Sequence, residues 1–261
     1  MDADTETDTD TVATVAGLFR YPVKSLQGMA VDDLEVGADG AAGDRDRALV
    51  DVATGKLMSA KRWSRLLQGA ADDDGVALPD GRRFGYDDPD LDAVLSDWLG
   101  RPVALRRAGP GVEVVYEMTF DPPDDSAELV DIPAPTGTFL DLAAVHLVSR
   151  ETLAACATAR PDLDWDVRRF RPNVLIDAPG LEAFGEDDWC GRRLGVGGAV
   201  LSARQPTVRC AMPLRPQPGL DGQPALFRAL NDIHANHLGI YLDVVTPGPV
   251  RTGDAVTLLP A

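Results

Sequence analysis

Hydrophobic residues in this chain occur in short runs that glycine and proline interrupt. Short runs rich in valine, leucine and isoleucine are typical of β-strands. Short strands joined by Gly or Pro turns favour a barrel or a sandwich over a parallel sheet covered by helices. The pattern predicts strands at residues 12–21, 29–36, 48–52, 56–59, 144–148, 174–176, 193–196, 200–203, 241–245 and 250–259.

Helical patterns occur between these strands. Residues 91–99 are predicted as a helix that Gly100 ends. Ser149 can cap a helix over 152–158. A further helix is predicted over 225–237. The expected fold class is therefore mainly β with some helix (α+β).

An irregular, proline-containing stretch separates the predicted elements into two blocks. Residues 110–137 are long for a connection, so we interpret them as a domain linker or a loop that covers a site. The first ten residues contain five acids and no large apolar side chain, which predicts a disordered acidic tail over 1–10. Two domains are expected, at 11–109 and 138–261.

Charge narrows the choice of partners. The 25 basic and 42 acidic residues give a formal net charge of −17, and the acids are spread along the chain. Such a surface repels nucleic acid and anionic lipid, so neither is expected as a partner. With only three lysines in the chain, this dispersed acid excess favours a protein that stays hydrated in high salt over an acidic binding function.

The use of cysteine indicates an intracellular protein. Cys156, Cys190 and Cys210 form no CxxC pair and are too few to staple a secreted fold. The sequence contains no signal-peptide pattern and no apolar run long enough to cross a bilayer. We therefore expect a cytoplasmic monomer without a membrane partner.

Cys210 is the cysteine best placed for chemistry. It follows Arg209 and lies between Pro206 and Pro213. A neighbouring cation favours the thiolate, which is the form that reacts and binds metals. The residues alone leave three interpretations open: a buried inert thiol, a nucleophile with a histidine base, or a soft ligand to a transition metal.

Basic segments elsewhere could hold an anion. Lys24 beside Ser25 suits a phosphate, although a surface loop with a stray lysine explains the pattern equally well. Arg45 fits a salt-bridged hairpin entry better than a binding site. The arginines within 168–171 match phosphate oxygens, and pairing with the acids of 162–166 is the alternative.

Other polar clusters indicate structure before function. Residues 186–189, Glu-Asp-Asp-Trp, offer paired acids for acid–base work, but such a run is more often a turn with an anchoring aromatic. His146 lies in an apolar strand, which is typical of a core histidine. His234 and His237 make no metal site on their own.

Taken in order, these segments resemble the MOSC family, named after the C-terminal domain of molybdenum cofactor sulfurase, and the β-barrel domain that precedes MOSC domains. The N-terminal resemblance rests on Tyr21-Pro22-Val23-Lys24-Ser25, Asp44-Arg45 and Leu49-Val50-Asp51. The MOSC resemblance rests on residues 169–173, 186–189, 208–210, 238–241 and 247–254. Functional relatives in this family are the mitochondrial amidoxime-reducing component and its bacterial counterparts.

The resemblance implies two β-rich domains with a molybdenum cofactor, a molybdopterin carrying Mo, between them. Cys210 matches the cysteine that ligates the metal and stays bound during catalysis. We further expect Asp187 or Asp254 to supply protons. Cofactor contacts are expected from Lys24, Ser25, Arg45, Ser149, Arg171, Asn173, Arg209 and Tyr241.

The implied activity is reduction of N-hydroxylated compounds, namely hydroxylamines, amidoximes or N-hydroxylated bases. The chain has no four-cysteine cluster, so electrons are expected from a separate donor, a ferredoxin or a haem protein with its reductase. Two other functions stay open: a sulfur carrier with a persulfide on Cys210, and a carrier or storage protein for the cofactor.

The sequence departs from the family pattern in several places. Val208 stands where the reductases often have serine. Residues 59–61, Ser-Ala-Lys, stand where Thr-x-Arg is common, and the segment after Cys210 lacks an Asp-Pro-x-Thr-Gly turn. These departures bear on how the cofactor and the substrate would be contacted.

Overall fold

The computed structural model describes residues 10–109, 115–118, 130–133 and 138–260. These residues form mostly strands, with three α-helices, so the predicted mainly-β class with some helix is confirmed. Nearly all of the tail predicted over 1–10, and most of the loop predicted over 110–137, lie outside the described residues.

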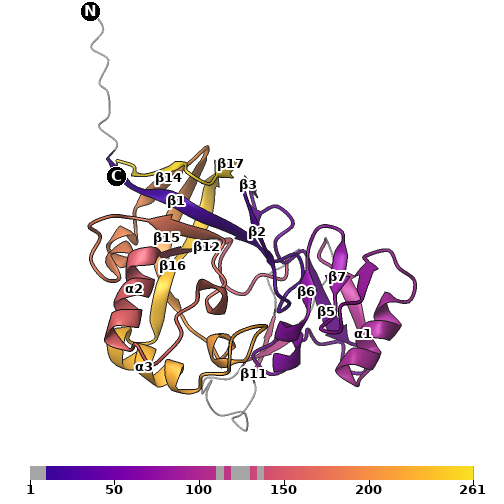
Figure 1. Ribbon diagram of the computed structural model, residues 1–261. Helices are drawn as coiled ribbons and strands as arrows, with labels where there is room; N and C mark the ends of the chain where they lie inside the picture. The colour runs from indigo at the N-terminus through magenta and orange to yellow at the C-terminus, as the bar shows by residue number, and fades with distance from the viewer. Residues whose placement is uncertain (1–9, 110–114, 119–129, 134–137, 261) are drawn as a thin grey trace, which may run out of the picture.

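A closed sheet of seven strands forms the larger lobe (Figure 1). Its spatial order is β13-β12-β16-β15-β14-β18-β1, and β1 pairs back with β13, which leaves no open edge in this ring. The short β2 (Met29–Val31) pairs with the far end of β1. The ring consists of β1 (Thr11–Arg20), β12 (Val145–Ser149), β13 (Val174–Asp177), β14 (Arg193–Val196), β15 (Ala199–Val208), β16 (His237–Thr246) and β18 (Ala255–Leu258).

Alternate residues of these strands fill the inside of the barrel. Side chains two apart on a strand point to the same face, and pairs such as Leu194 and Val196 or Ile240 and Leu242 are fully buried in one cluster. This apolar filling makes the larger lobe a packed scaffold that can hold loops at its rim in fixed positions.

The first strand belongs to the barrel. β1 pairs with β13 on one side and with β18 on the other. It therefore shares one closed sheet with strands from the second half of the chain, whereas the sequence-based boundaries assign residues 11–109 to a first domain. Those boundaries stay a prediction.

The smaller lobe is built from short hairpins around its own apolar cluster, which includes Leu49, Leu66 and Leu95. Helix α1 (Leu91–Leu99) ends where predicted, at Gly100, whose φ of 69° is left-handed. The strands outside the ring are β3 (Asp33–Gly37), β4 (Gly40–Ala41), β5 (Arg47–Asp51), β6 (Ala70–Ala71), β7 (Gly75–Ala77), β8 (Arg83–Gly85), β9 (Val103–Arg107), β10 (Val115–Met118), β11 (Val130–Pro133) and β17 (Gly248–Arg251).

Two helices pack against the outside of the barrel over a third apolar cluster (Figure 1). Helix α2 (Arg150–Ala159) begins two residues before the predicted stretch 152–158, and Ser149 caps it as predicted, since its hydroxyl oxygen accepts the Thr152 N–H at 3.0 Å. Helix α3 (Ala225–His234) stops earlier than the predicted end at residue 237, because Ala235 and Asn236 adopt left-handed backbone angles.

Several predicted strands were wrong in extent or partner. The stretch 29–36 divides into β2 and β3, and the stretch 250–259 divides into β17 and β18. The neighbouring stretches 48–52 and 56–59, both predicted as strands, share only a single bridge from Val50 to Leu57, since β5 pairs with β9 instead. In each case a distant partner strand, which local sequence does not reveal, decides the pairing.

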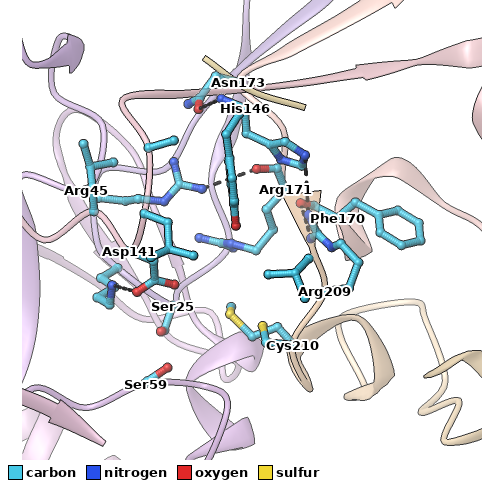
Figure 2. Close-up of a pocket in the computed structure, with 17 residues that line it drawn as sticks. Ser25, Arg45, Ser59, Asp141, His146, Phe170, Arg171, Asn173, Arg209 and Cys210 are labelled. Atoms are coloured by element: carbon cyan, nitrogen blue, oxygen red, sulfur yellow. Dashed lines mark hydrogen bonds and ion pairs between the residues drawn. The ribbon is translucent and has the colours of Figure 1, made fainter. Parts of the chain in front are cut away.

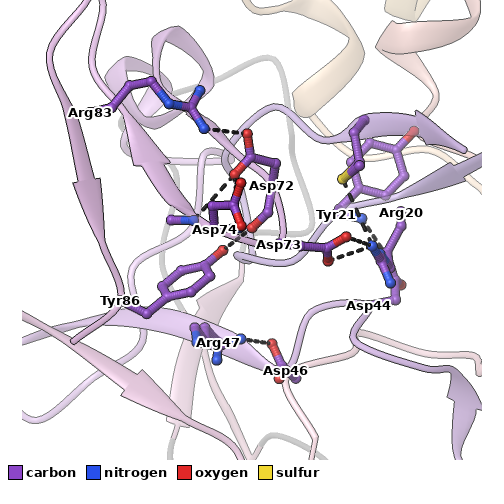
Figure 3. A network of polar contacts seen from close by, with 12 residues as sticks. Arg20, Tyr21, Asp44, Asp46, Arg47, Asp72, Asp73, Asp74, Arg83 and Tyr86 are labelled. Atoms are coloured by element: carbon purple, nitrogen blue, oxygen red, sulfur yellow. Dashed lines mark hydrogen bonds and ion pairs between the residues drawn. The ribbon is translucent and has the colours of Figure 1, made fainter.

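A polar network joins the lobes (Figure 3). Arg20, at the end of β1, forms an ion pair with Asp73 in the turn between β6 and β7. In the same region the Tyr86 hydroxyl donates to the Asp72 carbonyl at 2.6 Å, and the Arg47 guanidinium lies 3.9 Å from the Tyr86 ring centre. The Arg20–Asp73 ion pair connects the barrel strand to the small lobe, and the other two contacts order the small lobe beside it.

Candidate functional site

One pocket is lined by loops of the small lobe and by the rim of the barrel (Figure 2). In Figure 2, Arg45, Asp141 and Ser25 approach it from one side, and Arg209, Phe170 and Cys210 from the other. Most of the residues predicted from the sequence meet here: Lys24, Ser25, Arg45, Arg171, Asn173, Arg209, Cys210 and Tyr241.

The pocket is rich in positive charge. Lys24, Arg45, Arg171 and Arg209 line it, against the single carboxylate of Asp141. Lys24 and Arg171 are only 5% and 6% exposed. Burying cations in excess over anions is costly unless a ligand compensates them. In a chain of net charge −17, this local reversal indicates a site for an anionic group.

Two of the arginines share one aromatic ring. The guanidinium carbons of Arg45 and Arg171 lie 4.8 Å and 4.1 Å from the centre of the Tyr21 ring. Burial, and then the charge of Arg45, lowers the pKa of Arg171 to about 10. The ring face attracts both cations, but their mutual repulsion remains, so a bound anion between them would be stabilising.

Two buried guanidinium nitrogens of pocket-lining residues have no hydrogen-bond partner among the described residues. They are Nη2 of Arg171 and Nε of Arg209. The other groups of these side chains are engaged: Arg171 Nη1 donates to the Leu26 carbonyl at 2.7 Å, and Arg209 Nη2 donates to the Phe170 carbonyl at 2.8 Å. An unsatisfied buried donor is unfavourable, so these two N–H groups are ready to bind ligand oxygens.

Asp141 connects two lysines across the pocket. Lys24 Nζ binds Asp141 Oδ1 and the Phe139 carbonyl, and Lys61 Nζ lies 3.0 Å from Asp141 Oδ2. Burial alone would raise the pKa of Asp141, but the charges of Lys24 and Lys61 hold it well below its usual range. Asp141 is therefore a carboxylate that offsets part of the positive charge.

His146 lies against Arg209. Its Nε2 is 3.4 Å from Arg209 Nη1. Burial, followed by the charges of Arg209 and Arg45, holds the pKa of His146 well below its usual range, so the ring is neutral. Gly239 makes room for it: with φ of 77°, a Cβ there would lie 2.7 Å from His146 Nε2 and 2.4 Å from the Leu147 carbonyl oxygen.

Cys210 follows the end of β15 and is half-buried at the pocket wall. The peptide before it is fixed from both sides by Asn236. The Arg209 N–H donates to the Asn236 carbonyl at 2.9 Å, and Asn236 Nδ2 donates to the Arg209 carbonyl at 2.7 Å. The thiol is thus carried on a backbone segment with a defined orientation.

Backbone strain gathers at this pocket. Ser25, Arg45 and Arg171 have φ values of 71°, 50° and 54°, in the left-handed region that side chains other than glycine rarely adopt. Each lies in a loop that brings one pocket side chain inward. Such residues persist only where the surroundings fix them, and they cluster at functional sites.

Three residues predicted for the site are not among those that line the pocket. Ser149 caps α2, and its hydroxyl donates to Glu186 at 2.9 Å. Asp187 lies 2.7 Å from His234 Nε2. Asp254 accepts the Arg251 N–H at 2.7 Å in the turn between β17 and β18.

Sequence reasoning missed other pocket residues. Asp141 follows an irregular stretch and belongs to no motif, and only its lysine partners reveal it. His146 was interpreted as a core histidine; it is buried, but it also lines the pocket. Ser59 belongs to the Ser-Ala-Lys variant noted above, which was the only available signal.

Comparisons with known proteins identify the class. Residues 12–80 match the MOSC N-terminal beta barrel domain, and residues 135–257 match the MOSC domain. The chain therefore belongs to the MOSC family, as a protein in which the N-terminal domain precedes the MOSC domain.

Two curated relatives resemble this chain, and one of them is named for the molybdenum cofactor. It is 26% identical to a molybdenum cofactor sulfurase from Oryza sativa subsp. japonica, over 74% of this chain but only 27% of that protein. It is also 26% identical to mitochondrial amidoxime-reducing component 1 from Xenopus laevis, over 95% of this chain and 83% of that protein. Among solved structures, the YUAD protein from Bacillus subtilis is 16% identical, with a TM-score of 0.47 over 96% of this chain and 97% of that one.

Two features are absent from the described part of the chain. No helix in the described part of the chain is long and apolar enough to cross a membrane. Within the same residues, no group of three or more His, Cys, Asp or Glu side chains is arranged to hold a metal ion.

The pocket residues fit a molybdenum cofactor. Its phosphate and polar pterin edge need hydrogen-bond donors and positive charge, and the unpaired N–H groups of Arg171 and Arg209 supply both. Its metal would take a thiolate ligand, and the thiol of Cys210 lines the same pocket.

Proposed function

We propose that this protein is a molybdenum-cofactor-dependent oxidoreductase that reduces N-hydroxylated compounds, such as hydroxylamines, amidoximes and N-hydroxylated bases. The observation that carries the proposal is that a thiol, Cys210, and four cations share one pocket of an otherwise acidic protein. The name of the Xenopus laevis relative, an amidoxime-reducing component, supports the same class of reaction.

The pocket residues divide into metal-binding and anion-binding roles. Cys210 would give the metal a thiolate ligand. Lys24, Arg45, Arg171 and Arg209 would hold the phosphate and the ring edge of the cofactor. Hydroxyl and amide groups would complete the contacts: Ser25 Oγ already accepts the Ala60 N–H at 3.0 Å, so its own proton is available, and Asn173 and Tyr241 line the same pocket.

The net reaction breaks the N–O bond, takes up two electrons and two protons, and releases water. The bound cofactor would supply the electrons, which it would receive from a separate donor protein, a ferredoxin or a haem protein with its reductase. Burial raises the pKa of Tyr241, so this side chain keeps its proton on Oη and can donate a hydrogen bond to the substrate. Asp187 and Asp254 have no role in this scheme, because neither lines the pocket. The reaction is proposed to take place in the cytoplasm.

Metal analysis joined to a turnover assay tests the proposal. Protein purified from a host that makes the cofactor is expected to carry about one molybdenum per chain. Cys210→Ala should lose the metal, whereas the matched variant Cys190→Ala, a half-buried cysteine outside the pocket, should keep it. With an artificial reductant, wild-type protein should reduce benzamidoxime; a full complement of molybdenum without any turnover of N-hydroxylated compounds would overturn the assignment.

A second candidate function is sulfur transfer. The name of the Oryza sativa relative, a molybdenum cofactor sulfurase, favours it, and Cys210 is a free thiol in the pocket. In that case Cys210 would carry a persulfide in place of a metal bond. Intact-protein mass spectrometry distinguishes the two, because a persulfide adds the mass of one sulfur atom, which a reducing agent removes, in protein that contains no molybdenum.

A further inference from the structure

The pocket has an apolar side that its cations do not explain. Leu142 and Val208 line it and are 47% and 46% exposed. They are two of the five large hydrophobic side chains that are exposed among the described residues. A single exposed valine or leucine needs no explanation, but two at one pocket form an apolar rim. Other apolar side chains that line the pocket are Leu140, Ala143, Phe170 and Met212.

The rim (Leu142 and Val208) is held in place by the barrel. Val208 is the last residue of β15 and pairs with His237 of β16. The Leu142 carbonyl accepts a hydrogen bond from the guanidinium of Arg204, which lies on β15 and also contacts Asp243 at 3.2 Å. Both rim side chains are therefore presented at fixed positions.

The rim borders the reactive part of the pocket. Val208 is two residues before Cys210, and Leu142 directly follows Asp141. A cofactor held by Arg45, Arg171 and the other cations would leave the rim as the surface that a molecule approaching from solvent meets first. Leu142 and Val208 offer no hydrogen bond or ion pair to a charged body, whereas an uncharged apolar body gains free energy by covering them.

We propose that Leu142 and Val208 bind the hydrocarbon body of the substrate and make this protein selective for N-hydroxylated compounds with an uncharged aryl or branched alkyl group. The inference rests on the proposed function and adds the substrate class to it. The segment 208–210 thereby places the Cys210 thiol close to Val208, one of the two proposed hydrophobic contacts.

A matched pair of substrates tests the rim. Benzamidoxime and acetamidoxime share the same N–O group and differ in a phenyl against a methyl group. With an artificial reductant, which removes the donor protein from the assay, wild-type kcat/KM should favour benzamidoxime by about 10-fold or more. In the double variant Leu142→Ser/Val208→Ser the ratio of the kcat/KM for benzamidoxime to that for acetamidoxime should fall by at least about fivefold. The ratio is the readout because any effect of Val208→Ser on the bound cofactor acts on both substrates alike.

Controls separate the rim from general effects. Val245→Ser changes a valine that is 49% exposed but does not line the pocket, so it should keep the wild-type preference. Because both rim side chains are exposed, serine there should leave the melting temperature unchanged. An unchanged preference in the folded double variant overturns the inference, as does a defect that occurs only with a protein electron donor, since the rim would then be a donor contact.

Binding calorimetry tests the rim separately from the proposed reduction reaction. Benzamidoxime is titrated into oxidised, molybdenum-loaded protein, in which no turnover occurs. Tighter binding to wild type than to the double variant supports the rim, and equal binding overturns it, whether or not the reduced protein is active. If wild type turns over neither amidoxime, the proposed reaction fails while this binding comparison still decides the role of the rim.

Discussion

Asn236 holds Arg209 by a reciprocal pair of hydrogen bonds, one through its backbone carbonyl at 2.9 Å and one through its side-chain amide at 2.7 Å. The pair continues the β15–β16 ladder one step beyond its last bridge, between Val208 and His237. Asn236 has φ of 61°, which asparagine tolerates better than most residues. The orientation of the Arg209–Cys210 peptide thus depends on a residue outside the pocket.

Substitutions at Asn236 should change the reactivity of the Cys210 thiol although Cys210 itself is unchanged. Asn236→Ala removes the amide and strains the backbone, and should cost about 2 kcal/mol of stability. Asn236→Gly also removes the amide but relieves the backbone strain, so it should recover part of the stability lost in Asn236→Ala. The Arg209–Cys210 peptide should still lack the hydrogen bond that orients it. The rate of Cys210 alkylation as a function of pH should change alike in both variants. A wild-type profile in Asn236→Gly would show that the amide does not orient the thiol.

Anions should stabilise the cofactor-free protein through Arg171. Pyrophosphate at about 100 times its dissociation constant is expected to raise the melting temperature by about 5 °C, because it binds the folded state alone. Arg171→Met, which removes one of the two buried unpaired donors, should abolish most of this rise. Arg228→Met is the matched control, since the Arg228 side chain is exposed on α3. An equal rise in all three proteins would place the anion elsewhere.

The free energy of unfolding at acid pH should depend on the charge of Asp141. Its pKa is depressed by Lys24 and Lys61 despite burial, so its stabilising effect is present above the ordinary value of about 3.9 and is lost as pH falls further. Asp141→Asn should lower the free energy of unfolding at neutral pH by about 3 kcal/mol, because buried Lys24 loses its carboxylate.

Urea unfolding from neutral pH down to about pH 3 measures this effect. The difference between wild type and Asp141→Asn should shrink towards the acid end. Asp243→Asn, at an exposed ion pair with Arg204, should change stability by less than about 0.5 kcal/mol throughout. A constant difference across the pH range would mean that packing, not charge, explains the loss.

The stability contribution of Glu186 should depend on pH in the opposite direction to that of Asp141. It is fully buried, and burial raises its pKa although hydroxyls of Ser149 and Thr152 donate to it at 2.9 Å and 2.7 Å. A raised pKa means that the stability contribution is present below about pH 4.3 and is lost as pH rises through the folded-state value. Glu186→Gln should therefore be more stable than wild type at neutral pH, by about 1 kcal/mol, and equal in acid. Urea unfolding of both proteins at neutral pH and in acid measures this difference. If Glu186→Gln is less stable than wild type at neutral pH, the expected stabilisation is wrong.

Local signals predicted the parts of the fold that depend on neighbours in sequence. Gly100 ends α1 and Ser149 begins α2, as expected, because a cap involves only adjacent residues. The pairing of β5 with β9 could not be predicted this way, since the partner strand lies far along the chain and competes with a nearer candidate at Leu57.

The candidate site shows the same difference between residues that sequence motifs reveal and residues that distant partners determine. Arg45 and Arg171 are found from the order of family motifs, and the structure brings both to one ring, that of Tyr21. Asp141 escaped detection because its partners Lys24 and Lys61 lie in the other lobe and no local pattern marks it. Ser149 shows the converse: its hydroxyl serves the cap of α2 and Glu186, a structural use that the motif did not reveal.

The position of β1 has a consequence for the order of events during synthesis. This first strand pairs with β13 and with β18, so the barrel closes only after β18 has left the ribosome. Contacts of such long sequence separation form slowly. The pocket loop with Lys24 follows β1 directly and is anchored by it. A chain that ends before β18 would leave one side of β1 unpaired and would emerge with a disorganised pocket.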